Sequence, residues 1–508
     1  MTPERTPGAA PFPSFHPASR HRLGALLACA ALGLALAACD EAPVEGEAAA
    51  EAVPQATAPP LASAVGATGS PNPLGELAAG PVPDSGGGGS SRTSAPANPF
   101  LALGGFGEEE QPEVLLSSLN FPDPSLAACV RETGKTYVHE VITLDCSNRG
   151  ITSLAGVEQL TALQSMDMAH NQIADLRPGF APKGLVALDL AYNELVDASA
   201  VAELTQLGEL DLSHNQIRDV APLAGLSELA TLELNHNQLI DISGITTLQR
   251  LSFLNLGHNQ ISDISALQAI PFLTGLELGY NQITDITPLA GADGLSGLNL
   301  EGNQISDLTP LADLKELVFL IVGNNRINDL NPLKNLASLR KLDITNNEVY
   351  DLSPLAGLTR LLSLYAGGNL IDGLDPLGPI SGMMHLDLSY NHLVGLEGLG
   401  GKPFLSSLDL RGNAVNDVRA VAQLTSLGTL DLSRNQVENV APLAGLPHIQ
   451  VLDLSANRIN AGVTALAALD RPATIDLSAN SAIPCADLNT LETAHGPGHV
   501  VRPSECTN

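Results

Sequence analysis

An asparagine recurs every 22 residues through most of this 508-residue sequence, and no other feature limits the fold as strongly. It stands within the pattern Leu-x-Leu-x-x-Asn-x-Ile-x-Asp-Ile-x-x-Leu, which the segment from Leu254 to Ile264 matches at every fixed position. A unit this short cannot bury an apolar face alone, so the repeats must stack and share a continuous core. Fourteen asparagines keep the step, and Asn480 follows after 23 residues: Asn171, Asn193, Asn215, Asn237, Asn259, Asn281, Asn303, Asn325, Asn347, Asn369, Asn391, Asn413, Asn435 and Asn457.

The pattern is the signature of a leucine-rich repeat, in which a short strand and a short helical turn form each coil of a solenoid. We predict an α/β solenoid: a curved, right-handed horseshoe with a parallel concave β-sheet and a convex side of short 3-10 or irregular segments. We expect about 16 coils including both caps. The predicted boundaries are an N-terminal cap over 113–157, repeats over 158–480 and a C-terminal cap over 481–508.

The fixed residues of the repeat have structural explanations. Leu-x-Leu places two side chains inward and one outward, as the period of a strand requires. A buried asparagine at a tight turn can donate to and accept from neighbouring backbones, so we assign the asparagines no binding role. An aspartate four residues later is interpreted as a cap of the following turn, in preference to an acidic ridge for metal ions. It recurs as Asp175, Asp197, Asp219, Asp241, Asp263, Asp285, Asp307, Asp329, Asp351 and Asp417.

The N-terminus predicts export. A basic segment at 20–22 precedes an apolar run over 23–38, which is short for a bilayer span but suits a signal peptide. The run ends in Leu-Ala-Ala before Cys39 and resembles a bacterial lipobox. We predict a lipoprotein signal peptide over 1–38 and lipidation of Cys39, with ordinary secretory cleavage as the alternative. Residues 39–112 are dominated by Ala, Pro, Gly, Ser and Glu and are predicted to form a disordered tether.

Four further cysteines flank the repeats as two pairs, Cys129 with Cys146 and Cys485 with Cys506. In an exported protein this arrangement favours two disulfide bonds over zinc ligation, one in each cap. Loops of 17 and 21 residues give each bond about 3 kcal/mol in the chain-entropy model. Asp123-Pro124 is typical of the N-cap and first position of a helix.

Several segments carry a family resemblance: Asp123 to Leu126, Val141 to Asp145, Gly150 to Glu158, and copies such as Asn281 to Leu289. Together the segments resemble the internalin family of bacterial surface proteins over about residues 121–490. The resemblance implies extracellular protein recognition through the concave sheet. Cysteine-paired caps and an N-terminal lipid anchor in place of a C-terminal sorting signal depart from the family, so host invasion is not implied.

The sequence has 55 acidic and 24 basic residues, a formal net charge of −31, which argues against nucleic acid as a partner. Counted from each repeat asparagine, positions −6, −4, −2 and −1 are predicted to face the concave side. Eleven of 15 residues at −4 are acidic. Carboxylates stacked on neighbouring strands repel unless cations or a basic partner relieve them. Solvated repeat filler is the alternative.

Aromatic residues are scarce, with no Trp, 6 Tyr and 10 Phe, yet several fall on predicted concave positions. Exposed aromatic side chains rimmed by charge are typical binding hot spots. We predict that a protein partner binds this face through Phe253, Tyr280, Phe319, Ile321, Tyr365 and Tyr390. An envelope scaffold or polysaccharide-binding module on the same face is the alternative. We expect a monomer held at the cell envelope, periplasmic or surface-exposed, by its N-terminal lipid.

The first six residues of the −1 column are all aromatic, four histidines and two tyrosines, in the order His170, Tyr192, His214, His236, His258 and Tyr280. Adjacent imidazoles raise the hypotheses of a Zn²⁺ site at His214, His236 and His258, or of a pH sensor near 6.5, although an ordinary polar strand edge is favoured. The sequence shows no nucleophile with a base, no phosphate loop and no acid pair in a closed pocket. We therefore predict neither an enzyme nor a cofactor.

Overall fold

A computed structural model describes residues 113–469 and 473–506. The predicted signal peptide, Cys39 and the tether over 39–112 lie outside these residues. In the described part of the chain, no helix combines the length and apolar character needed to cross a membrane.

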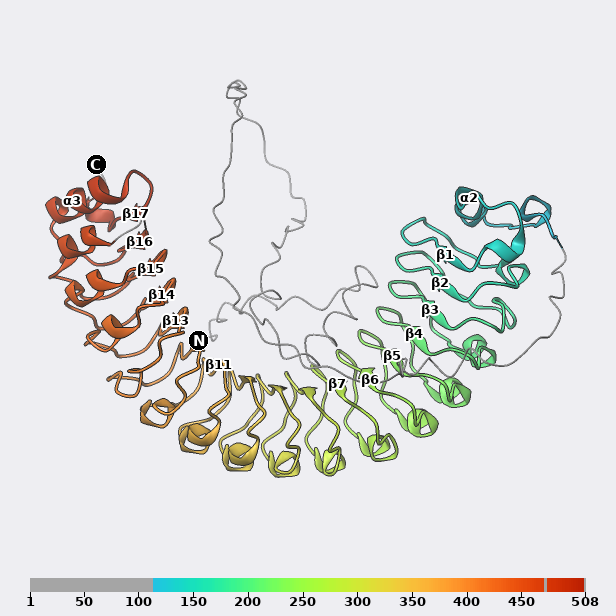
Figure 1. Cartoon of the computed structure of the whole chain (residues 1–508), viewed down its shortest axis with the longest axis horizontal. Helices are drawn as coiled ribbons and strands as arrows, with labels where there is room; N and C mark the ends of the chain where they lie inside the picture. The colour runs from blue at the N-terminus through green and yellow to red at the C-terminus, as the bar shows by residue number, and fades with distance from the viewer. Residues whose placement is uncertain (1–112, 470–472, 507–508) are drawn as a thin grey trace, which may run out of the picture. The chain divides into compact units, whose positions relative to one another are not determined.

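Within these residues the chain forms one open sheet of 17 parallel strands, which lines the inner side of an arc (Figure 1). Each strand pairs with the strand of the next repeat, in the order of the sequence. The predicted horseshoe fold is confirmed. The strands are β1 Thr143–Asp145, β2 Ser165–Asp167, β3 Ala187–Asp189, β4 Glu209–Asp211, β5 Thr231–Glu233, β6 Phe253–Asn255, β7 Gly275–Glu277, β8 Gly297–Asn299, β9 Phe319–Ile321, β10 Lys341–Asp343, β11 Ser363–Tyr365, β12 His385–Asp387, β13 Ser407–Asp409, β14 Thr429–Asp431, β15 Val451–Asp453, β16 Thr474–Asp476 and β17 Val500–Val501.

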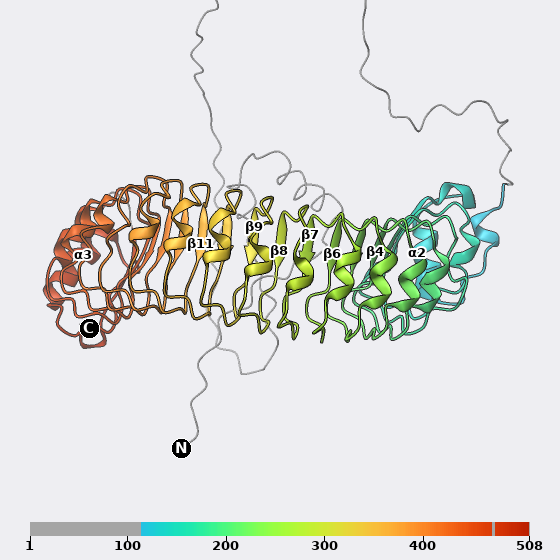
Figure 2. The same cartoon turned by 90° about the horizontal axis from the view of Figure 1, so that it is seen from below.

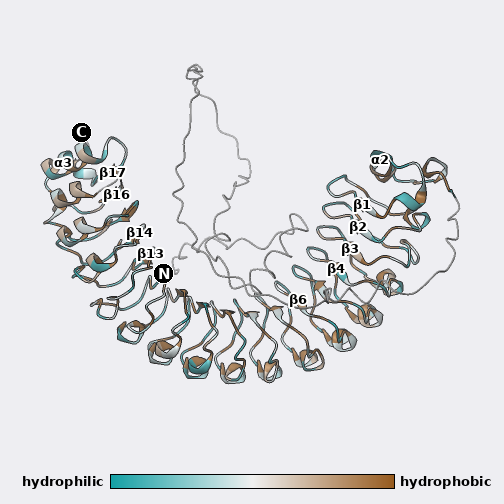
Figure 3. Cartoon of the chain, viewed as in Figure 1, coloured by the Kyte–Doolittle hydropathy of each residue, from teal (hydrophilic) through white to brown (hydrophobic). Residues whose placement is uncertain are grey.

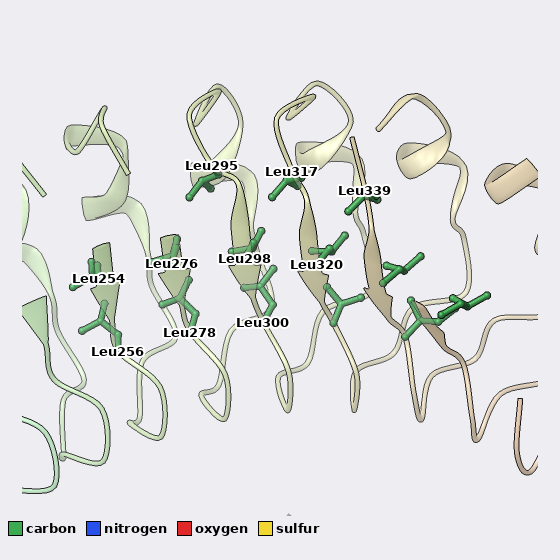
Figure 4. Close-up of a cluster of buried hydrophobic side chains, with 14 of the residues drawn as sticks. Leu254, Leu256, Leu276, Leu278, Leu295, Leu298, Leu300, Leu317, Leu320 and Leu339 are labelled. Carbon is green, nitrogen blue, oxygen red and sulfur yellow. The ribbon is translucent and has the colours of Figure 1, made fainter. Parts of the chain in front are cut away.

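Each of the strands β1 to β16 covers positions −6 to −4 relative to the repeat asparagine, and equivalent residues pair in register. The leucine at −5 points into the core, and so does the leucine at −3 just beyond the strand, as Leu254 and Leu256 show (Figure 4). Both side chains are fully buried, and so is Leu295, which lies in the turn just ahead of β8. Burial of each leucine stabilises the fold by about 1.5–3 kcal/mol. Apolar and polar residues alternate along every coil (Figure 3), so one apolar side of each repeat meets the next.

The convex side carries short 3-10 helices, which lie side by side along the outer surface (Figure 2). Many begin with a proline at the first or second position, as Pro222 does, because its fixed φ suits the turn and its missing N–H needs no partner. The helices are η2 Leu116–Ser118, η3 Val138–Glu140, η4 Val157–Gln159, η5 Ser199–Glu203, η6 Ala221–Gly225, η7 Ser243–Thr247, η8 Ser265–Ala269, η9 Thr287–Leu289, η10 Thr309–Leu311, η11 Asn331–Asn335, η12 Ser353–Gly357, η13 Asp375–Leu377, η14 Val421–Gln423, η15 Ala441–Gly445, η16 Val463–Ala468 and η17 Ser504–Cys506.

The repeated aspartate ahead of these helices acts as predicted. Asp219 Oδ1 accepts a hydrogen bond from the backbone N–H of Ala221 at 2.8 Å. Asp263 and Asp285 accept in the same way from the residue two positions on, each at 2.8 Å. The capping interpretation is confirmed for these three copies, since each of the three carboxylates satisfies a donor of its own turn.

The repeat asparagines form a buried ladder. Asn281 Nδ2 donates to the carbonyl oxygens of Leu256 and Leu278, each at 3.0 Å, and its Oδ1 accepts from the N–H of Ile261 at 3.0 Å. One side chain thus ties its own turn to the preceding repeat. The predicted structural role of the asparagines is confirmed, because these backbone groups would otherwise be buried without partners.

Both ends of the array are covered. Helix α2, Pro124–Glu132, begins at the predicted N-cap, where Asp123 Oδ1 accepts from the N–H groups of Ser125 and Leu126. Helix α3, Cys485–His495, packs on η16 and leads to β17. A disulfide joins Cys129 to Cys146 at the first end, and another joins Cys485 to Cys506 at the second.

Candidate functional site

The concave surface consists of four columns of side chains, of which only two lie on strands. Residues at −6 and −4 flank the buried leucine of each strand and are mostly half-buried. Residues at −2 and −1 lie beyond the strand in a tight turn, where the −1 residue is left-handed, with φ of 52° at His214 and 57° at Tyr280. The interpretation of the −1 column as a strand edge is therefore wrong, because the −1 residue lies outside the strand. The backbone must turn sharply there to direct the asparagine into the core.

The column at −4 has a structural function that the sequence did not reveal. Its short aspartate or asparagine side chains accept a hydrogen bond from the N–H two residues later, as Asp189 does from Ala191 at 2.9 Å and Asn299 does from Glu301 at 2.9 Å. Such Asx turns hold the chain in the bend that follows each strand. Most of the acidic column is thus part of the fold, although many of its side chains, such as Asp387 and Asp453, remain half-exposed.

Four residues interrupt this column: Glu233, Glu277, Ile321 and Tyr365, on β5, β7, β9 and β11. The interruptions fall on every second repeat, between aspartates or asparagines that keep the Asx turn. Ile321 and Tyr365 lack a carboxylate or amide that could close the turn. At these two positions the −4 side chain does not close the Asx turn.

Carboxylates whose pKa is raised by burial occur along the −4 column in both halves of the array. Burial, with repulsion from Glu233, raises the pKa of Asp211 to about 7, and burial raises the pKa of Glu233 and of Glu277 to about 7. Asn255 lies between the two glutamates and donates to Glu233 Oε2 at 2.9 Å. Towards the C-terminus Arg411 Nε donates to Asp431 Oδ2 at 2.9 Å, and burial raises the pKa of the neighbouring Asp409 to about 6.

The six aromatic residues at −1 form one continuous ring stack: His170, Tyr192, His214, His236, His258 and Tyr280. Neighbouring ring centroids lie 3.8 to 4.4 Å apart, and the ring planes differ by 11° to 17°. Burial lowers the pKa of His236 and of His258, because a charged imidazole loses hydration between two rings. Parallel stacking places ring faces, not nitrogen lone pairs, towards one another. Among the described residues no group of three His, Cys, Asp or Glu side chains is arranged to hold a metal ion.

The ring stack ends where the −1 residue becomes glycine. A Cβ on Gly302 would lie 2.7 Å from the ring of Tyr280, so the tyrosine lies over the bare backbone of the next repeat. Tyr390 lies over Gly412 in the same manner. The Tyr280 hydroxyl donates to Glu301 Oε1 at 2.7 Å, and this oxygen also accepts from Asn324 Nδ2 at 2.9 Å.

At −6 two glycines separate two phenylalanines. Phe253 on β6 lies over Gly275, where an added Cβ would meet its ring at 2.8 Å. Gly297 on β8 has open space, because an added Cβ would meet nothing within 4 Å, and it pairs in register with Phe319 on β9. On β10, Lys341 Nζ lies 5.3 Å from the ring centroid of Tyr365. This distance is typical of a cation–π contact.

Comparisons with known proteins agree with this architecture. The family model "Leucine Rich repeats (2 copies)" matches residues 205–248, 227–269 and 249–291. The crystal structure of an internalin, InlF from Listeria monocytogenes, has a TM-score of 0.56 and 29% identity and covers 66% of this chain and 96% of its own. The chain is an internalin-like leucine-rich repeat protein.

Two further structures share the fold. A leucine-rich repeat protein of Leptospira interrogans has a TM-score of 0.65 and 24% identity, covering 72% of this internalin-like chain and 96% of its own. The plant peptide hormone receptor RGFR1 has a TM-score of 0.54 and 20% identity, covering 69% of this chain and 65% of its own. A search of curated sequences gave no match.

The structure divides the six predicted contact residues of the internalin-like protein into two groups. Phe253, Phe319, Ile321 and Tyr365 lie on strands β6 to β11. Tyr280 and Tyr390 lie beyond the strands in the −1 column, both exposed. Sequence reasoning missed Glu301 and the glycines at 275 and 297. A run of glycines within one column of the repeat is the signal that could have located this bare surface.

Proposed function

We propose that this internalin-like protein is exported, is anchored in the cell envelope through lipid on Cys39, and binds a protein partner through the concave surface of β6 to β12. Leucine-rich repeat proteins generally mediate protein–protein interaction. Their fold is typically a non-enzymatic scaffold. The plant receptor RGFR1, whose likeness concerns the fold alone, is described in complex with RGF2.

The observation that carries the proposal is the replacement of Asx-turn residues by Ile321 and Tyr365. Elsewhere the −4 side chain stabilises the turn, so a large apolar group at this position gives up a hydrogen bond within the fold. Both side chains remain half-buried on the sheet surface, and Ile321 shares strand β9 with Phe319. Apolar and aromatic anchors surrounded by polar residues provide most of the free energy at protein interfaces.

The test is capture of the partner from the native envelope by purified protein. We expect the double substitution Phe319→Ala and Tyr365→Ala to weaken capture at least 100-fold, because truncation of each hot-spot residue removes about 2 kcal/mol. The matched control is Thr429→Ala with Ser407→Ala, two substitutions on β13 and β14 of the same sheet. Undiminished capture by the first variant would refute the concave-face proposal, and selective loss of glycan retention would favour the polysaccharide-binding alternative.

Anchoring is tested separately. With Cys39→Ser we expect the protein to leave the membrane fraction and appear in the soluble fraction, because a protein without its acyl chains loses stable membrane affinity. Fractionation followed by immunoblotting measures this shift, with Cys129→Ser as a control that alters a cysteine in the N-terminal cap. Persistence of the Cys39 variant in membranes would refute lipidation at this residue.

A further inference from the structure

The centre of the concave face contains a bare patch of backbone, here called the glycine seat: the surface over Gly275 and Gly297 between Phe253 and Phe319. The Phe253 ring covers Gly275, so the open part lies over Gly297. Gly297 is half-exposed and does not have a positive φ, so no backbone strain requires a glycine there. A missing side chain without a conformational reason leaves room for a ligand to approach the sheet closely.

Carboxylates outnumber cations near the glycine seat, where Lys341, in register with Phe319, is the one basic side chain on strands β6 to β10. Glu277 lies on β7, Glu301 just beyond β8 and Asp343 on β10. Burial raises the pKa of Glu277 to about 7 and also raises the pKa of Asp343, so these two carry less charge near neutral pH than exposed carboxylates do. None of the ion pairs in the described residues involves any of these three carboxylates. On β13 and β14, in contrast, Arg411 forms ion pairs with Asp409 and Asp431 of the −4 column.

Glu301 is also held in a fixed position. Its Oε1 accepts from the Tyr280 hydroxyl at 2.7 Å and from Asn324 Nδ2 at 2.9 Å. Asn324 Oδ1 in turn accepts from Asn346 Nδ2 at 2.9 Å. A half-exposed carboxylate that is oriented before binding loses little conformational freedom when a cation reaches it.

We propose that an extended, cationic peptide segment of the protein partner occupies the glycine seat, with a lysine or arginine facing Glu301 and apolar neighbours against Phe253 and Phe319. This inference rests on the proposed function, because it names the chemistry of the partner at the same face. From β6 to β10 the sheet spans four inter-strand steps of about 4.8 Å, or about 19 Å, which about six extended residues cover.

The probes are synthetic peptides of about ten residues, in which valine alternates with lysine, glutamine or glutamate. We expect the lysine peptide to bind the full chain at least 10-fold more tightly than the glutamine peptide, and the glutamate peptide to bind least. Rising salt should remove most of the lysine preference, because counterions reach the half-exposed carboxylate of Glu301. Titration by fluorescence anisotropy measures all three affinities.

Two substitutions locate the site. Glu301→Gln keeps the acceptor for Tyr280 and Asn324 but removes the charge. We expect it to weaken binding of the lysine peptide about 10-fold and to leave the affinity for the glutamine peptide unchanged. Gly297→Leu fills the seat from a Cβ position that meets nothing within 4 Å, and we expect both peptides to bind at least 10-fold more weakly. The matched controls are Glu209→Gln, which removes a carboxylate at −6 on β4, and Ser407→Leu, which adds bulk at −6 on β13.

Equal affinity for the lysine and glutamine peptides, or equal effects of the control and test substitutions, would overturn the cationic assignment. Retention of an acidic polysaccharide in place of the peptides would overturn it as well. These outcomes are separate from failure of the proposed function, which is read from native partner capture by the Phe319 and Tyr365 variant.

Discussion

Single side chains in this protein hold several backbone groups at once, and the repeat asparagine does so most fully. Asn281 satisfies two buried carbonyl oxygens and the N–H of Ile261. We expect Asn281→Ala to lower the free energy of unfolding by about 3 kcal/mol, since each buried group left without a partner costs about 1–3 kcal/mol. Urea denaturation measures the loss. The neighbouring exposed Gln282→Ala should change the free energy by less than about 0.5 kcal/mol, and similar losses for both would contradict the ladder.

The asparagine ladder and the aspartate caps could be predicted because each follows from one residue type at one fixed spacing. Asn281 must be buried at a turn if the leucines on both sides are buried, and Asp219 stands where the next helical turn begins. The left-handed conformation of His214 could not be derived from strand periodicity. A signal was present in the same column, where Gly302, Gly368 and Gly412 also occupy positive φ. Glycine at equivalent positions indicates a conformation that other residues adopt only under constraint.

At the scale of the strands, the acids at −4 make stability depend on pH. The pKa of Glu277 is raised to about 7 by burial, above its ordinary value of 4.5. The folded protein therefore holds more protons than the unfolded chain between these values. The stability that this protonation provides is fully present below about pH 4 and is lost as the pH rises through about 7.

Replacement of this glutamate removes that dependence. We expect Glu277→Gln to raise the free energy of unfolding at pH 8 by about 1 kcal/mol and to have little effect at pH 4, because a neutral amide needs no hydration of charge. The lowered pKa values of His236 and His258 act with the opposite sign, so the variant and the parent must be compared at each pH. Glu209→Gln, at an exposed position on β4, is the control. An equal increase in the free energy of unfolding at pH 4 and pH 8 would exclude burial of the charged carboxylate as the cause.

The strand scale also shows why the candidate site was predicted only in part. Phe319 and Ile321 could be placed on the concave face from the alternation Phe-Leu-Ile alone. Tyr280 was assigned to the same surface, but its ring stacks in the −1 column, because stacking depends on what the next repeat provides at the equivalent residue. The ring of Tyr280 stacks on His258 and lies over Gly302, so these two neighbours determine its position as much as its own backbone does.

At the scale of the whole repeat array, coils contact only their neighbours, so damage at one end should stay local. We expect joint substitution of Cys485→Ser and Cys506→Ser to destabilise the C-terminal cap by about 3 kcal/mol. Hydrogen exchange should then rise in α3, β17 and β16 and remain unchanged around β8, because an array of repeats frays from its ends. The equivalent substitutions at Cys129 and Cys146 provide the mirror control. Faster exchange throughout the array would show that the coils unfold as one unit.

The fold as a whole was predictable because one period governs most of the chain. The concave surface was less predictable, because the side chains of each repeat pack against those of the next. No single repeat therefore determines which of its side chains are exposed. Phe253 on β6 is three strands away from Phe319 on β9 and lies over Gly275 on β7. Only the stacked array shows that Gly297 on β8 is open.

The ring stack and its neighbours also make the concave face visible to spectroscopy. The chain has no tryptophan and only 6 tyrosines, so its near-ultraviolet fluorescence comes from tyrosine alone. Four of these, Tyr192, Tyr280, Tyr365 and Tyr390, stand on concave columns, and the phenol of Tyr280 is bonded to a carboxylate. We expect a molecule that binds at these columns to change their emission, because it would alter the surroundings of the phenol rings. The protein thereby reports occupancy of its own binding face without a dye, a label or an added chromophore.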